Sequence, residues 1–209
     1  MIALYGYPGS GKSYLARNLE DVLQIARVSA DRIRHELFRR PRYDAQETAI
    51  VGHLMNYVTD EFLRARVSVV YDINAMRIAQ RRRLQEIAKA HKAEYLLVWL
   101  QIDTENAFLR TQRRDRRTQD DKYSEAQTKA TFDRQMAAMQ NPQGEEYLVI
   151  SGKHSFITQK NAILTRLYNL GLVNVGDVQT HIAKPELINL VPNPYIAQID
   201  PSRRNINIF

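Results

Sequence analysis

Near the start of the chain stands Gly6–Ser13, which reads Gly-Tyr-Pro-Gly-Ser-Gly-Lys-Ser, with two glycines five positions apart followed by Lys and Ser. This is the spacing of a phosphate-binding loop, in which glycines let successive backbone N–H groups point into one concavity. The flanking residues fit the motif, because 2–5 is a short apolar run and 13–23 carries leucines at positions 15, 19 and 23. The sequence therefore predicts a strand, a phosphate loop and a helix in that order.

The loop residues predict a site for ATP and Mg²⁺. Lys12 is expected to reach the β- and γ-phosphates, and the Ser13 hydroxyl is expected to ligate the metal. Guanine-specific switches need Asn-Lys-x-Asp and Asp-x-x-Gly segments, and the sequence contains neither, which favours adenine. The other residues expected to line the nucleotide site are Gly6, Pro8, Gly9, Ser10, Gly11, Tyr14, Arg114 and Lys153.

The composition narrows the class of protein. The 209 residues are 44% hydrophobic and 25% charged, as in an ordinary globular domain. No run approaches a membrane span, and four apolar residues ahead of the loop are too few for a signal peptide, so we expect a cytoplasmic protein without a membrane partner. The absence of cysteine excludes disulfides, thiolate zinc sites and cysteine nucleophiles.

The formal net charge of +7 suggests an anionic partner. The excess is largely arginine and is clustered. A nucleic acid is one such partner, but a nucleotide-binding protein with a basic lid would have the same balance. Tyr43 and Tyr57 are available for stacking on bases, although the tyrosine content alone does not predict it.

Strand and helix patterns alternate along the chain. Apolar strands are expected at 2–5, 25–28, 67–72, 95–102 and 147–150, with helices between them. Five strands separated by helices predict an α/β fold of the P-loop NTPase type, with a parallel sheet and helices on both faces. Residues 1–172 are expected to form this domain, including a helical lid at about 104–140.

Residues 173–209 differ from the rest. Four prolines interrupt an apolar but irregular stretch, which is too rich in Leu, Ile and Val for expected disorder. We expect an irregular extension that packs on the domain or on a partner, so that an oligomer could form through it.

A carboxylate follows the second predicted strand. Asp31 lies where it can face the phosphate loop across the carboxyl edge of the sheet, the usual ligand crevice in such folds. Arg34 comes three residues later, so the two side chains share a helix face. Together they are suited to hold an acceptor hydroxyl and a nearby anionic group, which makes both candidate catalytic residues. The alternative is that Asp31 only caps its helix.

A second carboxylate, Asp72, ends the apolar run 67–72. This is the position of a Walker B carboxylate, from which Asp72 can reach Mg²⁺ or its waters. Ser13 and Asp72 form the predicted metal site, and Asp72 is also a candidate catalytic residue. The alternative is that the strand ends in Asp because Asp favours turns.

The predicted helix 105–117 carries Arg110, Arg113, Arg114 and Arg117 at i, i+3, i+4 and i+7. A surface helix normally mixes charges, so a single arginine stripe is expected to close over phosphates. Arg110 and Arg114 are therefore candidate catalytic residues, together with Lys12. The alternative is a solvated face whose charge is tempered by nearby aspartates.

Taken together, these segments resemble P-loop kinases of the polynucleotide 5′-hydroxyl kinase and zeta-toxin-like group, an AAA-type ATP-binding domain. The resemblance covers roughly residues 1–150 and rests on four segments. They are Gly-Tyr-Pro-Gly-Ser-Gly-Lys-Ser at 6–13, Ser-Ala-Asp-Arg-Ile-Arg at 29–34, Val-Val-Tyr-Asp-Ile-Asn at 69–74 and Asp-Thr-Glu-Asn-Ala-Phe-Leu-Arg-Thr-Gln-Arg-Arg at 103–114.

The resemblance implies a role for each matching residue. Asp31 would activate the acceptor hydroxyl, Arg34 would contact a substrate phosphate, and Arg114 would stabilise the transferring phosphoryl group. Ile73 departs from the Thr or Ala that is commoner between the Asp and Asn of the third segment. Three functions stay open: a polynucleotide 5′-hydroxyl kinase, a small-molecule kinase acting on a sugar, antibiotic or nucleotide sugar, and a non-catalytic ATP-binding module.

Overall fold

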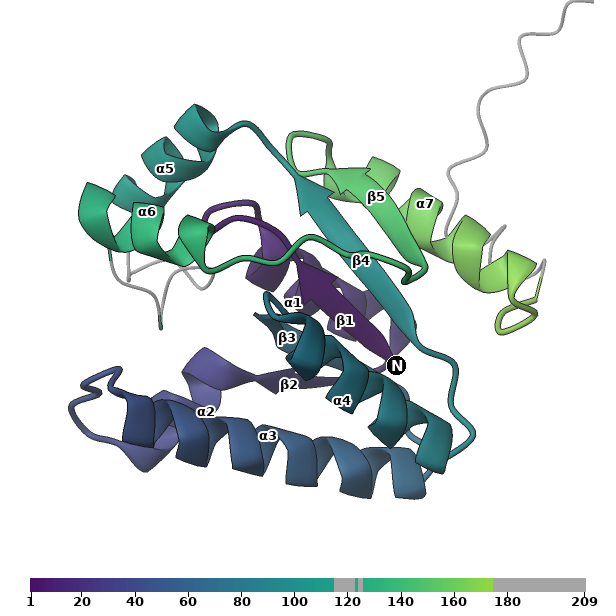
Figure 1. Cartoon of the computed structure of the whole chain (residues 1–209). Helices are drawn as coiled ribbons and strands as arrows, with labels where there is room; N and C mark the ends of the chain where they lie inside the picture. Colours follow the sequence, from purple (N-terminus) through teal and green to yellow (C-terminus); the bar gives the residue numbers. More distant parts are fainter. Residues whose placement is uncertain (115–122, 124–125, 175–209) are drawn as a thin grey trace, which may run out of the picture.

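A computed structural model of the chain describes residues 1–114, 123 and 126–174. A five-stranded parallel sheet of order β2-β3-β1-β4-β5 lies at its centre (Figure 1). This confirms the predicted α/β fold. The strands are β1 (Ile2–Tyr5), β2 (Ala26–Ser29), β3 (Val69–Asn74), β4 (Leu96–Gln101) and β5 (Tyr147–Ser151).

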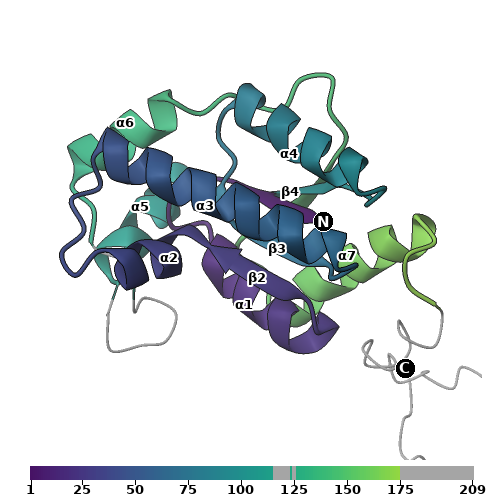
Figure 2. The same cartoon turned by 90° about the horizontal axis from the view of Figure 1, so that it is seen from below.

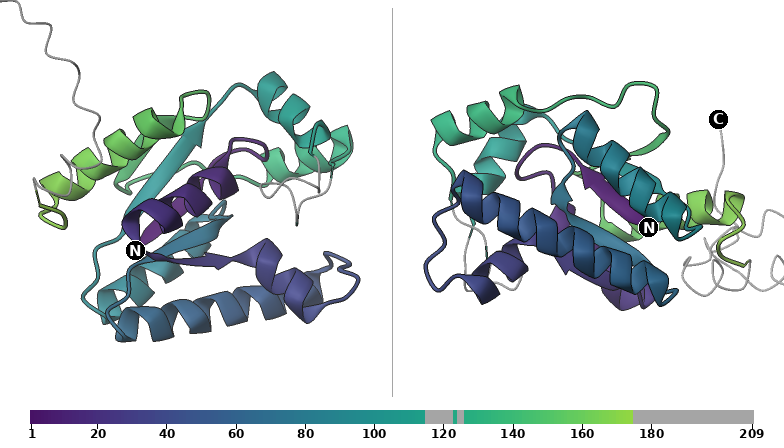
Figure 3. Two further views of the ribbon diagram at one scale, coloured as in Figure 1. Left: turned by 180° about the vertical axis from the view of Figure 1, so that it is seen from behind. Right: turned by 60° about the horizontal axis from the view of Figure 1, so that its bottom comes forward.

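Helices cover both faces of the sheet, with α3 and α4 on one side and α1 and α7 on the other (Figures 2 and 3). Two short helices, α5 and α6, lie beyond the carboxyl ends of the strands (Figure 1). The helices are α1 (Lys12–Leu23), α2 (Ala30–Leu37), α3 (Ala45–Arg64), α4 (Ile78–Ala90), α5 (Thr104–Gln112), α6 (Lys129–Ala137) and α7 (Phe156–Asn169).

Successive side chains of β3 point to opposite faces of the sheet, so this strand contributes to both hydrophobic cores. Val69 and Tyr71 face the core under α3 and α4, whereas Val70 faces the core under α1 and α7. The predicted apolar face of α1 is confirmed, because Leu15 and Leu19 are fully buried in the second core. The sheet is therefore packed against helices on both of its faces, which fixes the position of its carboxyl edge.

Helices α5 and α6, which lie in the segment predicted as a lid, share a small core with the phosphate loop. Ala107 of α5 and Phe132 of α6 are fully buried, and Tyr7 of the loop packs against them. The helix predicted at 105–117 ends at Gln112, and the second helix of the segment predicted as a lid at about 104–140 begins at Lys129 and ends at Ala137.

The prediction that the arginines form one stripe on a single helix is therefore wrong for the described residues. Arg113 is already the C-cap of α5, and Arg114 follows the helix. Arg117 lies outside the described residues, as does the predicted extension from residue 175 onward. Within the described part of the chain, none of the helices is long and apolar enough to cross a membrane.

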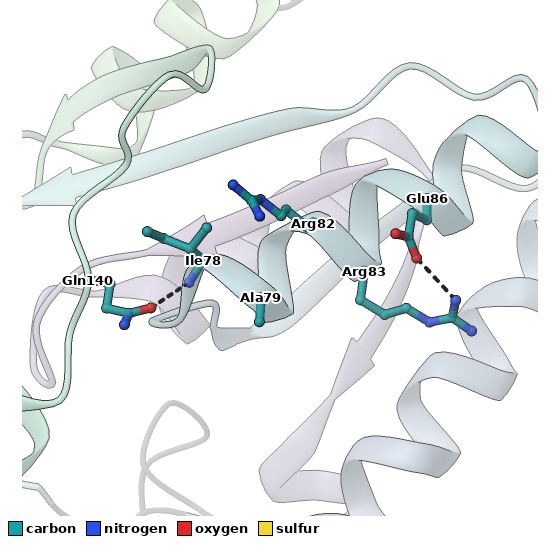
Figure 4. Close-up of a pocket in the computed structure, with 6 residues that line it drawn as sticks. All are labelled: Ile78, Ala79, Arg82, Arg83, Glu86 and Gln140. Carbon is teal, nitrogen blue, oxygen red and sulfur yellow. Dashed lines mark hydrogen bonds and ion pairs between the residues drawn. The ribbon is translucent and has the colours of Figure 1, made fainter.

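A buried arginine ties the segment after the lid to the body of the domain. Arg81 of α4 is fully buried, and its Nε and Nη2 donate to Glu145 at 2.7–2.9 Å. Its Nη1 donates to the carbonyl oxygens of Ala75 and Gln140 at 2.9 and 3.0 Å. The exposed side of α4 beside this segment is shown in Figure 4, where Gln140 accepts from the backbone of Ile78 at 2.9 Å.

We predict that Arg81→Ala lowers the free energy of unfolding by about 3–5 kcal/mol, because it leaves the carboxylate of Glu145 buried and unpaired. Urea unfolding followed by circular dichroism measures the change. The matched control is Arg83→Ala on the same helix, whose exposed pair with Glu86 at 3.2 Å is visible in Figure 4. That variant should lose only about 0–1 kcal/mol. Equal losses in the two variants would contradict this account of the Arg81 pair.

Candidate active site

The phosphate loop joins β1 to α1, as predicted. Gly11 is the N-cap of α1, so the backbone N–H groups of the first turn face the loop. Gly9 has a φ of 79°, and a Cβ placed on it would lie 2.2 Å from the carbonyl oxygen of Ala107. No other residue tolerates both the left-handed backbone and this close approach. The glycine therefore lets α5 of the lid pack directly against the loop.

Lys12 folds back over the loop. Its Nζ donates to the carbonyl oxygens of Gly6 and Tyr7 at 2.9 and 2.8 Å and to Ser10 Oγ at 3.4 Å. Desolvation of this enclosed ammonium group lowers the pKa of Lys12 to about 7; Asp72 and Asp31 act against the shift, and Arg114 adds to it. The ammonium group is thus held where anionic oxygens would replace its carbonyl partners.

Ser13 and Asp72 meet across the edge of the sheet. Ser13 Oγ donates to Asp72 Oδ1 at 3.0 Å, which brings together the hydroxyl and the carboxylate of the predicted metal site. These are oxygen donors of the kind that Mg²⁺ accepts alongside substrate phosphates. The residues therefore fit the ion. Burial raises the pKa of Asp72, and Arg27, with its Nε 3.9 Å from Asp72 Oδ2, opposes the rise.

Asp31 lies in the first turn of α2, whose N-cap is Ser29. Asp31 therefore does not cap the helix, and the alternative interpretation is wrong. Its Oδ1 lies 3.9 Å from Nη1 of Arg34, as expected for side chains on one helix face. Desolvation raises the pKa of Asp31, although 43% of its side chain stays exposed, and Arg34, Arg114, His35 and Lys12 act against the rise.

The electrostatic effects place Asp31 in the same site as the phosphate loop. Asp31 raises the pKa of Lys12, and it also raises that of Asp72, so these three charges act on one another. The meeting of Asp31 with the loop at the carboxyl edge stays a prediction, and these effects are consistent with it. Arg114 acts on both Lys12 and Asp31, which brings the end of the lid helix into the same electrostatic neighbourhood.

Three other predicted site residues, Arg110, Lys153 and Tyr14, contact groups outside the phosphate loop. Arg110 Nη1 donates to the carbonyl oxygen of Gly152 at 2.8 Å, so it joins the lid to the loop after β5. Lys153 in that loop pairs with Asp103 at 2.6 Å, ahead of α5. Tyr14 is 41% exposed, and its ring meets that of Phe156 edge-on at 6.4 Å between centroids. The loop after β5, the lid and the start of α1 thus lie together.

The structure also reveals residues that the sequence reasoning missed. Asn74 Oδ1 accepts from the backbone N–H of Gly6 at 3.3 Å and so fixes the start of the loop. Arg27 contacts Asp72 from β2. Glu47, which is 2% exposed, accepts from the backbone N–H of Arg42 and Tyr43 beside Arg34. The only available signal was the spacing of Asp44 and Glu47, which is typical of a helix start.

The fold and site define an α/β protein with a phosphate-binding loop at the carboxyl edge of a parallel sheet. The family model described as an AAA domain matches residues 1–142, and the chain belongs to that family. A comparison with curated protein sequences found no match.

Solved structures share the fold at low identity. They include a gluconokinase from Sinorhizobium meliloti 1021, with a TM-score of 0.59, 16% identity and coverage of 81% of this chain and 91% of that chain. The Mycobacterium tuberculosis APS kinase CysC in complex with AMPPNP and APS has a TM-score of 0.58, 15% identity and coverage of 80% and 96%. Chaetomium thermophilum Kti12 in complex with ADP-AlF3 has a TM-score of 0.60, 14% identity and coverage of 80% and 97%. This places the chain in the P-loop kinase-like fold.

We predict that nucleotide binding takes up a proton near neutral pH. The free protein loses the Lys12 charge as pH rises through about 7, and bound phosphates restore it by raising the pKa of Lys12. Affinity for ATP should therefore fall as pH rises above about 7 and stay level below it, apart from titration of the nucleotide itself. Calorimetry in buffers of different ionisation enthalpy measures the proton uptake. Lys12→Arg, which stays charged throughout, is the control and should remove this component; an unchanged uptake would contradict the assignment.

Proposed function

We propose that this protein is an ATP-dependent kinase that transfers the γ-phosphate to an acceptor hydroxyl, and that the acceptor is the 5′-hydroxyl end of a polynucleotide. The observation that carries the proposal is geometric: Ser13, beside the phosphate loop, donates to Asp72 at 3.0 Å, and Asp72 is paired in the sheet with Ser29, the N-cap of the helix that carries Asp31. A carboxylate in this position is suited to align an alcohol with a terminal phosphate.

In the proposed reaction, Asp31 accepts the hydrogen bond of the acceptor hydroxyl and directs its oxygen at the γ-phosphorus. A new O–P bond forms, the bond from the γ-phosphorus to the β-phosphate oxygen breaks, and the hydroxyl proton passes to Asp31. The raised pKa of Asp31 makes it a better proton acceptor than an ordinary aspartate. Ser13 and Asp72 would hold Mg²⁺, which would supply positive charge against the negative charge that develops on the phosphates.

Lys12 and Arg114 would stabilise the phosphoryl group during its transfer. Arg114 lowers the pKa of both Lys12 and Asp31, which supports a position of its guanidinium near both groups. Delocalised positive charge over the migrating group is the main demand of a loose transition state. Arg110 would act less directly, through its hydrogen bond to the loop that carries Lys153.

The net charge of +7 and the placement of Arg34 beside Asp31 support a nucleic-acid end as acceptor. One observation favours the second candidate, a small-molecule kinase. Glu47 lies 4.0 Å from Arg34 Nε and offsets part of its charge, as expected for a less basic acceptor site. The two candidates share the same chemistry and differ only in the molecule that bears the hydroxyl.

A transfer assay separates these candidates. Labelled ATP is offered with DNA and RNA carrying 5′-hydroxyl ends, with nucleosides, with sugars and with aminoglycosides. Transfer to the oligonucleotides that weakens steeply with salt supports the polynucleotide acceptor. Transfer to one small molecule alone supports the second candidate, and background labelling of every acceptor contradicts both.

We predict that Asp31→Asn lowers kcat of this transfer by about 10²–10⁴-fold, the contribution usual for a positioned proton acceptor. The affinity for ATP should change little, because Asp31 acts on the acceptor. The control is Asp21→Asn, an exposed aspartate of α1, which should leave transfer unchanged. Unchanged transfer by Asp31→Asn would contradict the role of Asp31 as proton acceptor, whereas a non-catalytic ATP-binding module would show no transfer with either protein.

A further inference from the structure

The loop between α2 and α3 holds an aromatic residue in an unusual backbone conformation. Tyr43 has a φ of 57°, in the left-handed region that bulky residues rarely adopt. Such conformations persist only where the surrounding structure imposes them, and they cluster at ligand-binding sites. The loop lies next to α2, which carries Asp31.

Glu47 imposes this conformation. Its carboxylate accepts from the backbone N–H of Arg42 at 2.9–3.0 Å and from that of Tyr43 at 2.9 Å. Glu47 is only 2% exposed, so these charge-assisted bonds form away from solvent and are correspondingly strong. The buried carboxylate of Glu47 therefore stabilises the conformation of this surface turn.

The turn places the Tyr43 ring on the acceptor side of the site. The ring centroid lies 4.6 Å from Cζ of Arg34, and the Tyr43 hydroxyl is 3.3 Å from Nε2 of His35. Arg34 in turn pairs with Asp31, so the ring is separated from the proposed acceptor carboxylate by one guanidinium group. Tyr43 nevertheless keeps 42% of its surface exposed.

Arg34 itself retains unused donor capacity. Its side chain is 8% exposed, and Nη2 donates to Thr48 Oγ1 at 3.2 Å. Its Nε is buried without a hydrogen-bond partner among the described residues, with Glu47 at 4.0 Å. Buried donors are normally satisfied. The guanidinium of Arg34 is thus held beside the ring between Asp31 at 3.9 Å and Glu47 at 4.0 Å.

We propose that Tyr43, positioned by Glu47, stacks on the nucleobase of the acceptor's terminal nucleotide. This rests on the proposed function. In a 5′-terminal nucleotide the base lies one sugar away from the reacting hydroxyl, just as the Tyr43 ring lies one side chain away from Asp31. A tyrosine face binds any base through stacking, so the platform would accept ends of varied sequence.

The first experiment uses the unaltered protein and two single-stranded oligonucleotides. They are identical except that one carries a base on its 5′-terminal residue and the other carries an abasic sugar with the same 5′-hydroxyl. We expect the abasic end to raise KM by about 10–100-fold, as loss of one base–aromatic stack does. Equal KM values would overturn the stacking proposal and leave the kinase proposal intact. Transfer to neither oligonucleotide, or to a sugar alone, would overturn both proposals.

Variants assign the effect to Tyr43. Tyr43→Leu should raise KM for the base-bearing end to the abasic value and leave KM for the abasic end unchanged, whereas Tyr43→Phe should behave like the unaltered protein. Tyr57→Leu is the matched control, since Tyr57 is 58% exposed on α3 outside this network. If Tyr43→Leu kept the full preference for the base, the assignment would be wrong.

Glu47→Gln tests the positioning role. It preserves the shape of the side chain but removes the charge that holds the turn, so KM should rise for the base-bearing end more than for the abasic end. A purely structural role would instead change both ends equally, or lower the amount of folded protein. Thermal melting of each variant identifies any that fails to fold, and the two-oligonucleotide comparison on the unaltered protein decides the proposal without them.

Discussion

The hydrogen bond from Ser13 to Asp72 joins the phosphate loop to the end of β3, and the arrangement of the site follows from that junction. The register of β1 against β3 shifts between Ala3 and Leu4, so that Asn74 reaches the N–H of Gly6. On its other side β3 pairs Asp72 with Ser29, the N-cap of α2. Asp31 therefore lies only two residues after Ser29, the residue that is paired with Asp72. The parallel pairing of β2 with β3 thus brings both carboxylates to the same edge of the sheet.

Electrostatic balance in the site is as restrictive as its geometry. Desolvation raises the pKa of both Asp31 and Asp72 and lowers that of Lys12, so burial opposes the charged form of each group. The attraction of Lys12 to the two carboxylates, with Arg27 and Arg34 alongside, offsets part of that cost, whereas the two carboxylates repel each other. Because desolvation disfavours the charged form of Lys12, a bound phosphate chain would stabilise that form by supplying negative charge beside it. The proposed binding of ATP and the proposed transfer would thus both depend on the desolvated charges of Lys12, Asp31 and Asp72.

Sequence patterns predicted those parts of the site that depend on local spacing. The loop at 6–13, the carboxylate Asp72 on the third strand and the Asp31–Arg34 helix face each follow from a few adjacent residues, and the structure has all three, although β3 runs two residues past Asp72 to Asn74. The arginine stripe failed because helical periodicity does not reveal where a helix ends, and α5 stops at Gln112. The Glu47–Tyr43 turn was not predictable, since it depends on the bond of a buried carboxylate to backbone N–H groups and not on side-chain pattern.

The lid and the phosphate loop form one mechanical unit. Tyr7 of the loop packs in the small core between α5 and α6, and Gly9 lets the Ala107 carbonyl approach the loop backbone. Arg110 holds the same helix to Gly152. Because packed groups transmit displacement instead of absorbing it, phosphates bound in the loop, as proposed, would act directly on α5. The end of α5 leads into Arg114, so the cation proposed to meet the migrating phosphoryl group is positioned by the loop that binds its donor.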